Sequence, residues 1–523
     1  MEDTQFSSVL EKLVQGSKKR DPRTIRLAAV TSALVEVAGN QPSKVYASTI
    51  SALERTLEVE NIQDSLSTQV ALLELLFTTI GYVEPPAILV ATLPLSSRVL
   101  RAIVNASVEA PTSETKDELG GSNAVLRWTC KASTELLKRV EPATDEKTTK
   151  TFLVGTLMAL MEDSRPKVRK AAHAGLFELL MTDGAHPVIR KTLNAYIQRE
   201  LITSLKQRRT DGSILHLLGF LEHSIDHLNM TKIGDQLMEY LVALFQSDES
   251  GADFISVQKV KESMPRILTI TSLLACVSKA MTSSIGSGNS EFASRVLATL
   301  IQGKPSLVFR HGTADEHTLQ RGRVLYGEAM LTGCRCLFRT NSPLIGKLFP
   351  LSLKLVVVLS KPHEDDPEDA TVAESLMVSV AQVVREEMGS LGSQTTETRQ
   401  MIGECLRIAL QTTDPDYRAS WSVSLPVVIA FLRLDLESPQ ATDAVEALIQ
   451  CHGRVPSGTS SQADVEAAFS SLVQGVGVEA VWPLILWSPS DHEAQENGAY
   501  MMVYVHSQMF PNMWSYSSWC SLG

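Results

Sequence analysis

The chain has 523 residues, a formal net charge of −11, and a composition that is 44% hydrophobic but only 6% aromatic. This length can hold about two to four globular domains or one elongated repeat array, and the aromatic-poor composition favours helix-on-helix packing over sheets. The net acidity argues against nucleic-acid binding over the whole surface and leaves open only local basic patches.

The cysteines and the apolar segments indicate a soluble intracellular protein. Seven scattered cysteines form no C-x-x-C pair, which is typical of reduced thiols. The first residues lack the layout of a signal peptide. The longest apolar run, Leu348–Ser360, is too short to span a bilayer and carries Lys354. We therefore expect no membrane contact.

Helical patterns follow one another from the first residues. Asp21–Gly39 has Pro22 early and Gly39 as a stop signal, Pro85–Ser107 is expected to bend at Pro94, and Asn123–Glu141 is a further helix. Strand-like alternation is almost absent, so these patterns predict an all-α protein.

A helical hairpin is predicted over Thr149–Leu180. The stretch EDSRPKVRKAAHAGLFELL, residues Glu162–Leu180, marks a helix start with Ser164 as a cap and Pro166 in the first turn. Ala172 and Gly175 leave room on its apolar face for close approach of another helix. The preceding apolar segment Thr149–Met161 supplies the first helix of the hairpin.

Further helical segments continue this pattern towards the C-terminus. They are Ile233–Ser247, Thr313–Phe338, Asp369–Met388 and Asp416–Leu434. Hairpins at intervals of roughly 40 residues predict a HEAT- or armadillo-like α-solenoid of stacked helical hairpins, continuous over residues 1–485. Surface loops rich in Pro, Gly, Ser and acid are expected near 105–123, 360–370 and 451–464.

The last segment, 486–523, differs from the array. It lacks helical periodicity, and four of the six tryptophans lie after residue 480. It is interpreted as a terminal cap, an interaction tail, or sequence foreign to the native array.

Asp163 and Arg169 suggest a polar ladder between stacked repeats. An acidic residue in the turn and a basic residue inside the second helix are typical of such ladders. The alternative is two surface charges on one hairpin.

No motif for catalysis or cofactor binding is present. The chain has no phosphate-binding loop, no dinucleotide fingerprint and no nucleophile elbow, and the glycines at Gly286–Gly288 read as a linker. His216, His223 and His227 fall on one exposed helical stripe, where a zinc site is geometrically conceivable. Without H-E-x-x-H, a cysteine or a third-helix ligand, we expect a solvated or partner-facing stripe. The sequence thus predicts no catalytic residue, no cofactor and no metal.

Two basic clusters are candidate contacts for RNA phosphates or protein partners. They lie at helix ends that a solenoid would place along one ridge; helix-end charges and ion pairs are the alternative. The candidate residues are Arg165, Lys167, Arg169, Lys170, Lys206, Arg208 and Arg209. A third cluster is Lys18–Arg20. Aromatic residues for base stacking are not interleaved, so the contact is expected with the RNA backbone. Arg169→Glu with Lys170→Glu is expected to weaken RNA association without unfolding the chain.

Several segments, in order along the chain, resemble the ribosomal-RNA-processing protein 12 family of large nucleolar helical-repeat proteins. They are Ala28–Gln41, Val125–Trp128, Arg165–Gly175, Tyr417–Trp421 and Gly475–Leu484. The similarity is strongest over residues 123–180 and extends weakly to about Leu486.

This resemblance implies a non-enzymatic scaffold in ribosome biogenesis. It implies roles in pre-rRNA processing and nuclear export of pre-ribosomal particles, mainly the small subunit, with assembly factors, rRNA and the nuclear transport machinery as partners. It implies a location in the nucleus and nucleolus, with shuttling to the cytoplasm. The alternative is a karyopherin-like transport receptor or a general HEAT-repeat scaffold. The chain is much shorter than the family, and 486–523 looks unlike it, so we expect a fragment, a truncated form or an imperfect gene model.

Overall fold

The computed structural model describes residues 2–410, apart from thirteen short gaps, and six single residues beyond them. The gaps are 16–20, 59–61, 85, 110–120, 141–146, 182–186, 229, 247–256, 286–289, 304–307, 310–313, 361–368 and 389–395, and the six further residues are 427, 428, 430, 431, 434 and 473. The predicted loop 451–464, the tail 486–523 and the basic cluster Lys18–Arg20 lie outside the described residues.

The chain divides into two compact units, Met1–Ile233 and Gly234–Gly523. The described residues of both units are helical and include no strand, which confirms the predicted all-α class. The extent of a single continuous array over 1–485 stays a prediction.

The first unit is a series of helical hairpins. Its helices are α1 (Glu2–Gln15), α2 (Pro22–Ala38), α3 (Pro42–Thr56), α4 (Ile62–Ile80), α5 (Ala87–Glu109), α6 (Ser122–Arg139), α7 (Lys147–Met161), α8 (Pro166–Met181), α9 (Pro187–Gln207) and α10 (Gly212–Ser224), followed by the short 3-10 helix η2 (Ile225–His227). Consecutive helices pair as α1–α2, α3–α4, α5–α6, α7–α8 and α9–α10.

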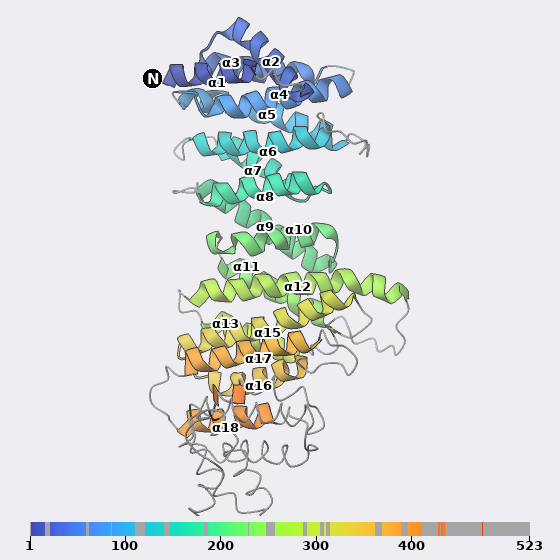
Figure 1. Cartoon of the computed structure of the whole chain (residues 1–523), viewed down its shortest axis with the longest axis vertical. Coiled ribbons are helices and arrows are strands. Elements are labelled where there is room, and N and C mark those ends of the chain that lie inside the picture. The colour runs from blue at the N-terminus through green and yellow to red at the C-terminus, as the bar shows by residue number, and fades with distance from the viewer. Residues whose placement is uncertain are drawn as a thin grey trace, which may run out of the picture. The chain divides into compact units, whose positions relative to one another are not determined.

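The hairpins of the first unit stack in two layers. In one layer α2, α4, α6, α8 and α10 contact one another in sequence, and in the other α3, α5, α7 and α9 do so (Figure 1). From α2 to α10, each helix therefore packs on its hairpin partner and on an equivalent helix of a neighbouring hairpin. This arrangement is that of a helical solenoid, as predicted.

Local sequence signals set the ends of several helices. Asp21 caps α2 by accepting hydrogen bonds from the backbone N–H groups of Arg23 and Thr24, both at 3.3 Å. Gly39 ends that helix with a φ of 69°, which favours glycine. Pro166 is the first residue of α8, as predicted, but the carbonyl of Arg165, not Ser164, accepts the first bonds of that helix.

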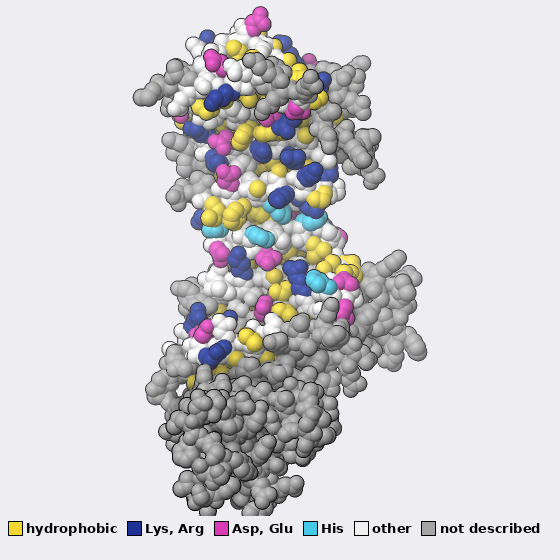
Figure 2. Space-filling model, in the orientation of Figure 1, with side chains coloured by type: hydrophobic (Ala, Val, Ile, Leu, Met, Phe, Trp, Pro, Cys, Tyr) yellow, Lys and Arg dark blue, Asp and Glu magenta, His cyan; other side chains and the backbone are white. Residues whose placement is uncertain are grey.

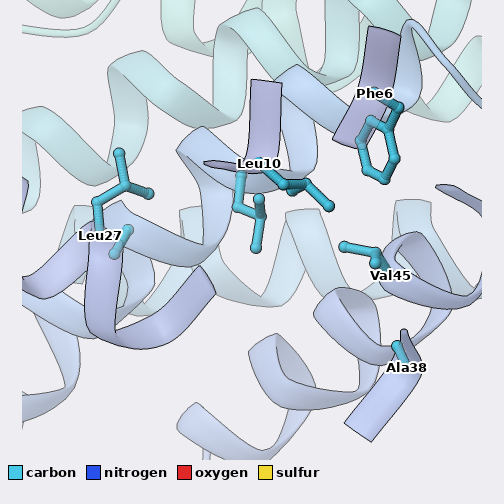
Figure 3. Close-up of a cluster of buried hydrophobic side chains, with 7 residues drawn as sticks. Phe6, Leu10, Leu27, Ala38 and Val45 are labelled. Carbon is cyan, nitrogen blue, oxygen red and sulfur yellow. The ribbon is translucent and has the colours of Figure 1, made fainter. Parts of the chain in front are cut away.

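The apolar faces of the first helices meet in a common core. Phe6 and Leu10 of α1 point towards residues of α2 and α3, including Leu27 and Val45 (Figure 3). Ala71 and Leu75 add the face of α4 to this cluster. Burial of such side chains contributes about 25 cal/mol per Å² of apolar area, which favours the stacked state.

The predicted close approach at Gly175 is confirmed. This glycine is buried where α8 contacts α6, and a Cβ added to it would stand 2.2 Å from Thr134 Oγ1. The two helices therefore lie closer together than a larger residue at this position would allow.

The second unit repeats the layered pattern. Its helices are α11 (Met230–Gln246), which begins just before the boundary, α12 (Val257–Ile285), α13 (Ser290–Gln302), α15 (Glu316–Arg339), α16 (Ile345–Leu359), α17 (Asp369–Glu387) and α18 (Thr396–Leu410). Helices α12, α15 and α17 contact in sequence, as do α13, α16 and α18, and α15 also packs on α13 and α16.

Two predicted loops are shorter than expected. The stretch 105–123 begins within α5, which runs to Glu109, and ends within α6, which starts at Ser122. The stretch 360–370 overlaps α17, which begins at Asp369. The residues of these stretches that belong to helices include no Pro or Gly, so the helix-breaking residues lie further inside each stretch.

One apolar helix is longer than the apolar run identified from sequence. Among the described residues, Ala87–Ser107 of α5 has the length and composition of a membrane span. In the structure α5 packs against α3, α6 and α7, and it carries Arg98 and Arg101. Core helices of helical arrays share this length and composition.

Candidate functional site

The two predicted basic clusters lie on neighbouring turns of the first unit. One starts α8 and the other ends α9. Glu162, in the α7–α8 turn, accepts hydrogen bonds from the hydroxyl of Tyr196 in α9 and, at 2.5 Å, from that of Ser213 in α10. Because Ser213 follows the α9–α10 turn directly, the structure brings the two clusters to the same edge.

Arg165 stabilises the fold at this edge. Its guanidinium pairs with Asp163 at 2.6 Å, and its Nη1 donates to the carbonyl of Ser107 at 3.4 Å and to Ser122 Oγ at 3.3 Å. Its side chain is only 12% exposed. Arg165 therefore joins the α7–α8 turn to the preceding hairpin and is not free to bind a ligand.

Arg169 is also held internally. Its Nη1 donates to the backbone carbonyls of Asp163 at 2.8 Å and Ser164 at 2.7 Å. Burial raises the pKa of the Asp163 carboxyl, but hydrogen bonds from Arg165 and the charges of both arginines outweigh it and hold the pKa below the ordinary value.

The predicted ladder of Asp163 and Arg169 between stacked repeats is therefore wrong, since these two residues interact within one turn. The bridges to neighbouring hairpins come from Arg165 and Glu162 instead. The double change Arg169→Glu with Lys170→Glu is not a clean test of RNA binding, because it also breaks the turn.

One arginine of the second cluster, Arg209, forms an ion pair. Arg209 pairs with Asp211 at 2.9 Å, and Asp211 caps α10 by accepting from the backbone N–H groups of Ser213 at 3.1 Å and Ile214 at 3.2 Å. The hydrogen bond from Arg209 lowers the pKa of Asp211. Arg208 ends α9 with a φ of 48°, and its side chain is exposed.

Four of the seven candidates are exposed and make no ion pair with any described residue. They are Lys167, Lys170, Lys206 and Arg208. The other three support the fold, because Arg169 and Arg209 bind groups of their own turns and Arg165 also binds the preceding hairpin. Only the tertiary contacts separate these two groups, since all seven look alike in sequence.

Helix α6 adds cations that the sequence analysis missed. Lys131 is exposed and Arg127 is partly exposed, and neither forms an ion pair with a described residue. Figure 2 shows Lys and Arg side chains gathered over the α6–α8 part of this face. The signal was present as an i, i+4 pair of basic residues on a predicted helix.

Trp128 lies beside these cations, although no aromatic residue is interleaved with the two predicted basic clusters. Its ring has Lys131 Nζ at 4.2 Å and the Arg23 guanidinium carbon at 5.4 Å, and the ring of Phe77 lies 5.8 Å away. Through these contacts the indole links α6 to Arg23 of α2 and to Phe77 of α4. The ring is not presented as a bare platform for stacking bases.

The predicted histidine stripe is not one exposed stripe. Helix α10 ends at Ser224, so His227 lies in η2, where its ring packs edge-on against Phe177 at 6.0 Å. His216 is partly buried, and its Nδ1 has no hydrogen-bond partner. Only His223 is exposed, with its Nδ1 2.8 Å from the carbonyl of Gly219.

His173 of α8 completes this interface and was missed from sequence. Its ring packs edge-on against Phe220 of α10 at 5.4 Å, and its Nε2 is buried without a partner. Burial lowers the pKa of His173 to about 4, and burial also lowers the pKa of His216. Both imidazoles are therefore neutral near pH 7.

Metal-ligand clusters are not found in the described part of the chain. No group of three or more His, Cys, Asp or Glu side chains could hold an ion there. The described cysteines are free and buried, namely Cys130, Cys276, Cys334, Cys336 and Cys405. Burial raises the pKa of Cys334 to about 12, so this thiol stays protonated and unreactive.

Comparison with known proteins gives no family. No protein-family model and no curated protein sequence matches the chain. An engineered protein of known structure is similar at 15% identity, with 88% of this chain and 99% of the other covered and a TM-score of 0.23. A circular tandem repeat protein with novel repeat topology and enhanced subunit contact surfaces is similar at 14% identity, with 98% of each chain covered and a TM-score of 0.26. Scores this low do not bear on function.

Proposed function

We propose that this chain is a non-enzymatic scaffold in ribosome biogenesis. It acts in pre-rRNA processing and in nuclear export of pre-ribosomal particles, mainly those of the small subunit. Its partners are assembly factors, rRNA contacted through the backbone, and the nuclear transport machinery, and it works in the nucleus and nucleolus with shuttling to the cytoplasm. The sequence resemblance described above supports this role.

One structural observation carries the proposal. The hairpins of the first unit form a layered array with exposed cations along one edge that form no ion pair with any described residue. An array of this kind offers a broad docking surface, because each repeat contributes a few outward side chains to it. Unpaired lysines and arginines on such a surface attract phosphates even when the net charge of the protein is negative.

The test is co-sedimentation from cells that express a tagged full chain. We expect the chain to sediment with small-subunit precursors and to move to lighter fractions after ribonuclease treatment or a high-salt wash. Nucleolar localisation of the tagged chain is the second readout. A chain that is absent from precursor fractions and concentrated at the nuclear envelope would overturn the proposal in favour of a karyopherin-like receptor.

A further inference from the structure

Four cations on the outer surface of α6 and α8 form what we name the α6–α8 cation face. They are Arg127, Lys131, Lys167 and Lys170. Lys131, Lys167 and Lys170 are exposed and Arg127 is partly exposed. Lys131 contacts the ring of Trp128, and none of the four forms an ion pair with a described residue.

Three contacts set the register between α6 and α8. Ser122 accepts from Arg165 at the start of both helices, Thr134 lies against Gly175 in the middle, and Lys138 pairs with Glu178 at 2.8 Å further along.

This register places Arg127 level with Lys170. Lys131 is then level with the part of α8 that lies between Lys170 and the exposed Ala174. Since packed helix axes lie about 8–10 Å apart, the four cations occupy one compact area.

The opposite charges of these helices lie at their other ends and are already paired. Glu135 and Glu178 both contact Lys138, at 3.1 Å and 2.8 Å. These two carboxylates are therefore neutralised, while the residues of α6 before Glu135 and of α8 before Glu178 include no acidic side chain and carry only positive charge. The concentration of Lys and Arg on this face is visible in Figure 2.

The composition of the face favours phosphates over an acidic protein. A protein partner needs buried apolar anchors, whereas the other exposed residues of this part of α6 and α8 are Asn123, Pro166 and Ala174, none of which has a large apolar side chain. The nearest ring, Trp128, is covered by Lys131 and Arg23, so it offers neither an anchor pocket nor a stacking platform. Phosphate groups need only accessible cations.

We propose that the α6–α8 cation face binds the backbone of single-stranded RNA through its phosphates, without reading bases. This inference rests on the proposed function for the presence of pre-ribosomal RNA. In this proposal Arg127 and Lys131 join the residues that contact RNA. Arg165, Arg169 and Arg209 do not contact RNA, because these three arginines stabilise the turns.

The experiment uses the purified full chain and a fluorescent oligouridine of about 20 nucleotides, long enough to exceed the site. The test variant replaces all four cations with glutamine, and two further variants are Arg127→Gln with Lys131→Gln and Lys167→Gln with Lys170→Gln. The matched control is Arg190→Gln with Lys191→Gln, which removes two exposed cations of α9, in the other layer. Circular dichroism confirms that every variant stays folded.

We expect the fourfold variant to bind at least about tenfold more weakly at low salt. Its salt dependence should also be shallower by about 3 in the slope of log K against log salt, since each single-strand phosphate contact contributes about 0.7. Each double variant should show about half of this change, and the α9 control should bind like the unaltered chain.

Two outcomes would overturn the inference. In the first, the fourfold variant keeps its affinity and salt slope, or the α9 control loses as much. In the second, polyglutamate binding depends on the four cations while RNA binding does not, which would make the partner an acidic protein.

Failure of this inference is distinguishable from failure of the proposed function. An unaltered chain that sediments with precursors, together with a fourfold variant of unchanged RNA affinity, refutes only the cation face. A chain that never sediments with precursors, yet binds RNA through these four residues, refutes only the cellular role.

Discussion

At Gly175 the backbone of α8 lies so close to α6 that no side chain fits between them. A Cβ there would meet Thr134 Oγ1 at 2.2 Å, whereas a Cβ at Gly219 in α10 would meet nothing within 4 Å. The two glycines therefore lie in helices of the same layer, but only Gly175 lacks space for a side chain. This contrast provides a matched pair of substitutions.

We expect Gly175→Ala to destabilise the chain by about 1–3 kcal/mol, because overpacking forces the helices apart. Gly219→Ala should be neutral or stabilising by about 0.5–1 kcal/mol, as expected in an uncrowded helix interior. Urea unfolding followed by circular dichroism measures both. Adding Thr134→Ala to Gly175→Ala should recover part of the loss, and equal effects of the two glycine changes would contradict this account.

His173 makes stability depend on pH. The unfolded chain takes up a proton on this ring near its ordinary pKa of 6.5, whereas the folded chain does so near a pKa of about 4. Stability is therefore lost as the pH falls from 6.5 to 4. His216 adds to the loss in the same direction, because its pKa is also lowered.

We expect His173→Gln to flatten the pH dependence of unfolding between pH 6.5 and 4 by on the order of 2 kcal/mol. The measurement is the free energy of unfolding at several pH values for both chains. A variant whose stability falls as steeply as that of the unaltered chain would show that the ring is solvated in the folded state.

At the scale of elements, the α7–α8 turn links three hairpins. Arg165 reaches back to Ser107 at the end of α5 and to Ser122 at the start of α6. Glu162 reaches forward to Tyr196 of α9 and Ser213 of α10. The apolar faces stack the hairpins, and these polar contacts set their register.

We expect Glu162→Ala to speed amide hydrogen exchange in α9 and the first turn of α10 by about tenfold, which corresponds to the loss of about 1.4 kcal/mol. Exchange in α5 and α6 should not change. The control is Glu54→Ala, which removes only an exposed ion pair with Arg98 and should alter exchange little. Faster exchange spread evenly over all helices would contradict a local link.

At the scale of the whole molecule, the division into two units falls at the start of α11. Asp235 of this helix pairs with Arg295 of α13 at 2.8 Å, and the carbonyl of Leu244 accepts from Arg266 of α12. Helix α11 therefore belongs with the second unit. Stacked repeats depend mainly on their immediate neighbours, so each unit carries most of its own stabilising contacts.

We expect residues 1–229 to fold without the rest of the chain. The isolated segment should show a helical circular dichroism spectrum, a cooperative thermal transition and resistance to limited proteolysis. A segment that is unfolded or cleaved throughout would show that the first unit needs the second for stability.

The sequence by itself determined the all-α class, the helical hairpin at 149–180 and the close approach at Gly175. These features depend on periodicity, prolines, caps and small residues, which act within a few neighbouring positions. The predicted histidine stripe was wrong because it depended on local periodicity alone. The pattern predicts one helix through Ser224, whereas α10 ends there and the chain continues as η2.

Only the tertiary structure decided which cations are free and which support the fold. Arg165 and Lys167 stand two positions apart in one basic cluster, yet Arg165 finds partners 43 and 58 residues away in the preceding hairpin, while Lys167 finds none among the described residues. Partners at such separations are set by the stacking of hairpins, because burial of apolar faces contributes more to the register than surface ion pairs do. The cation face on α6 and α8 is a product of that register.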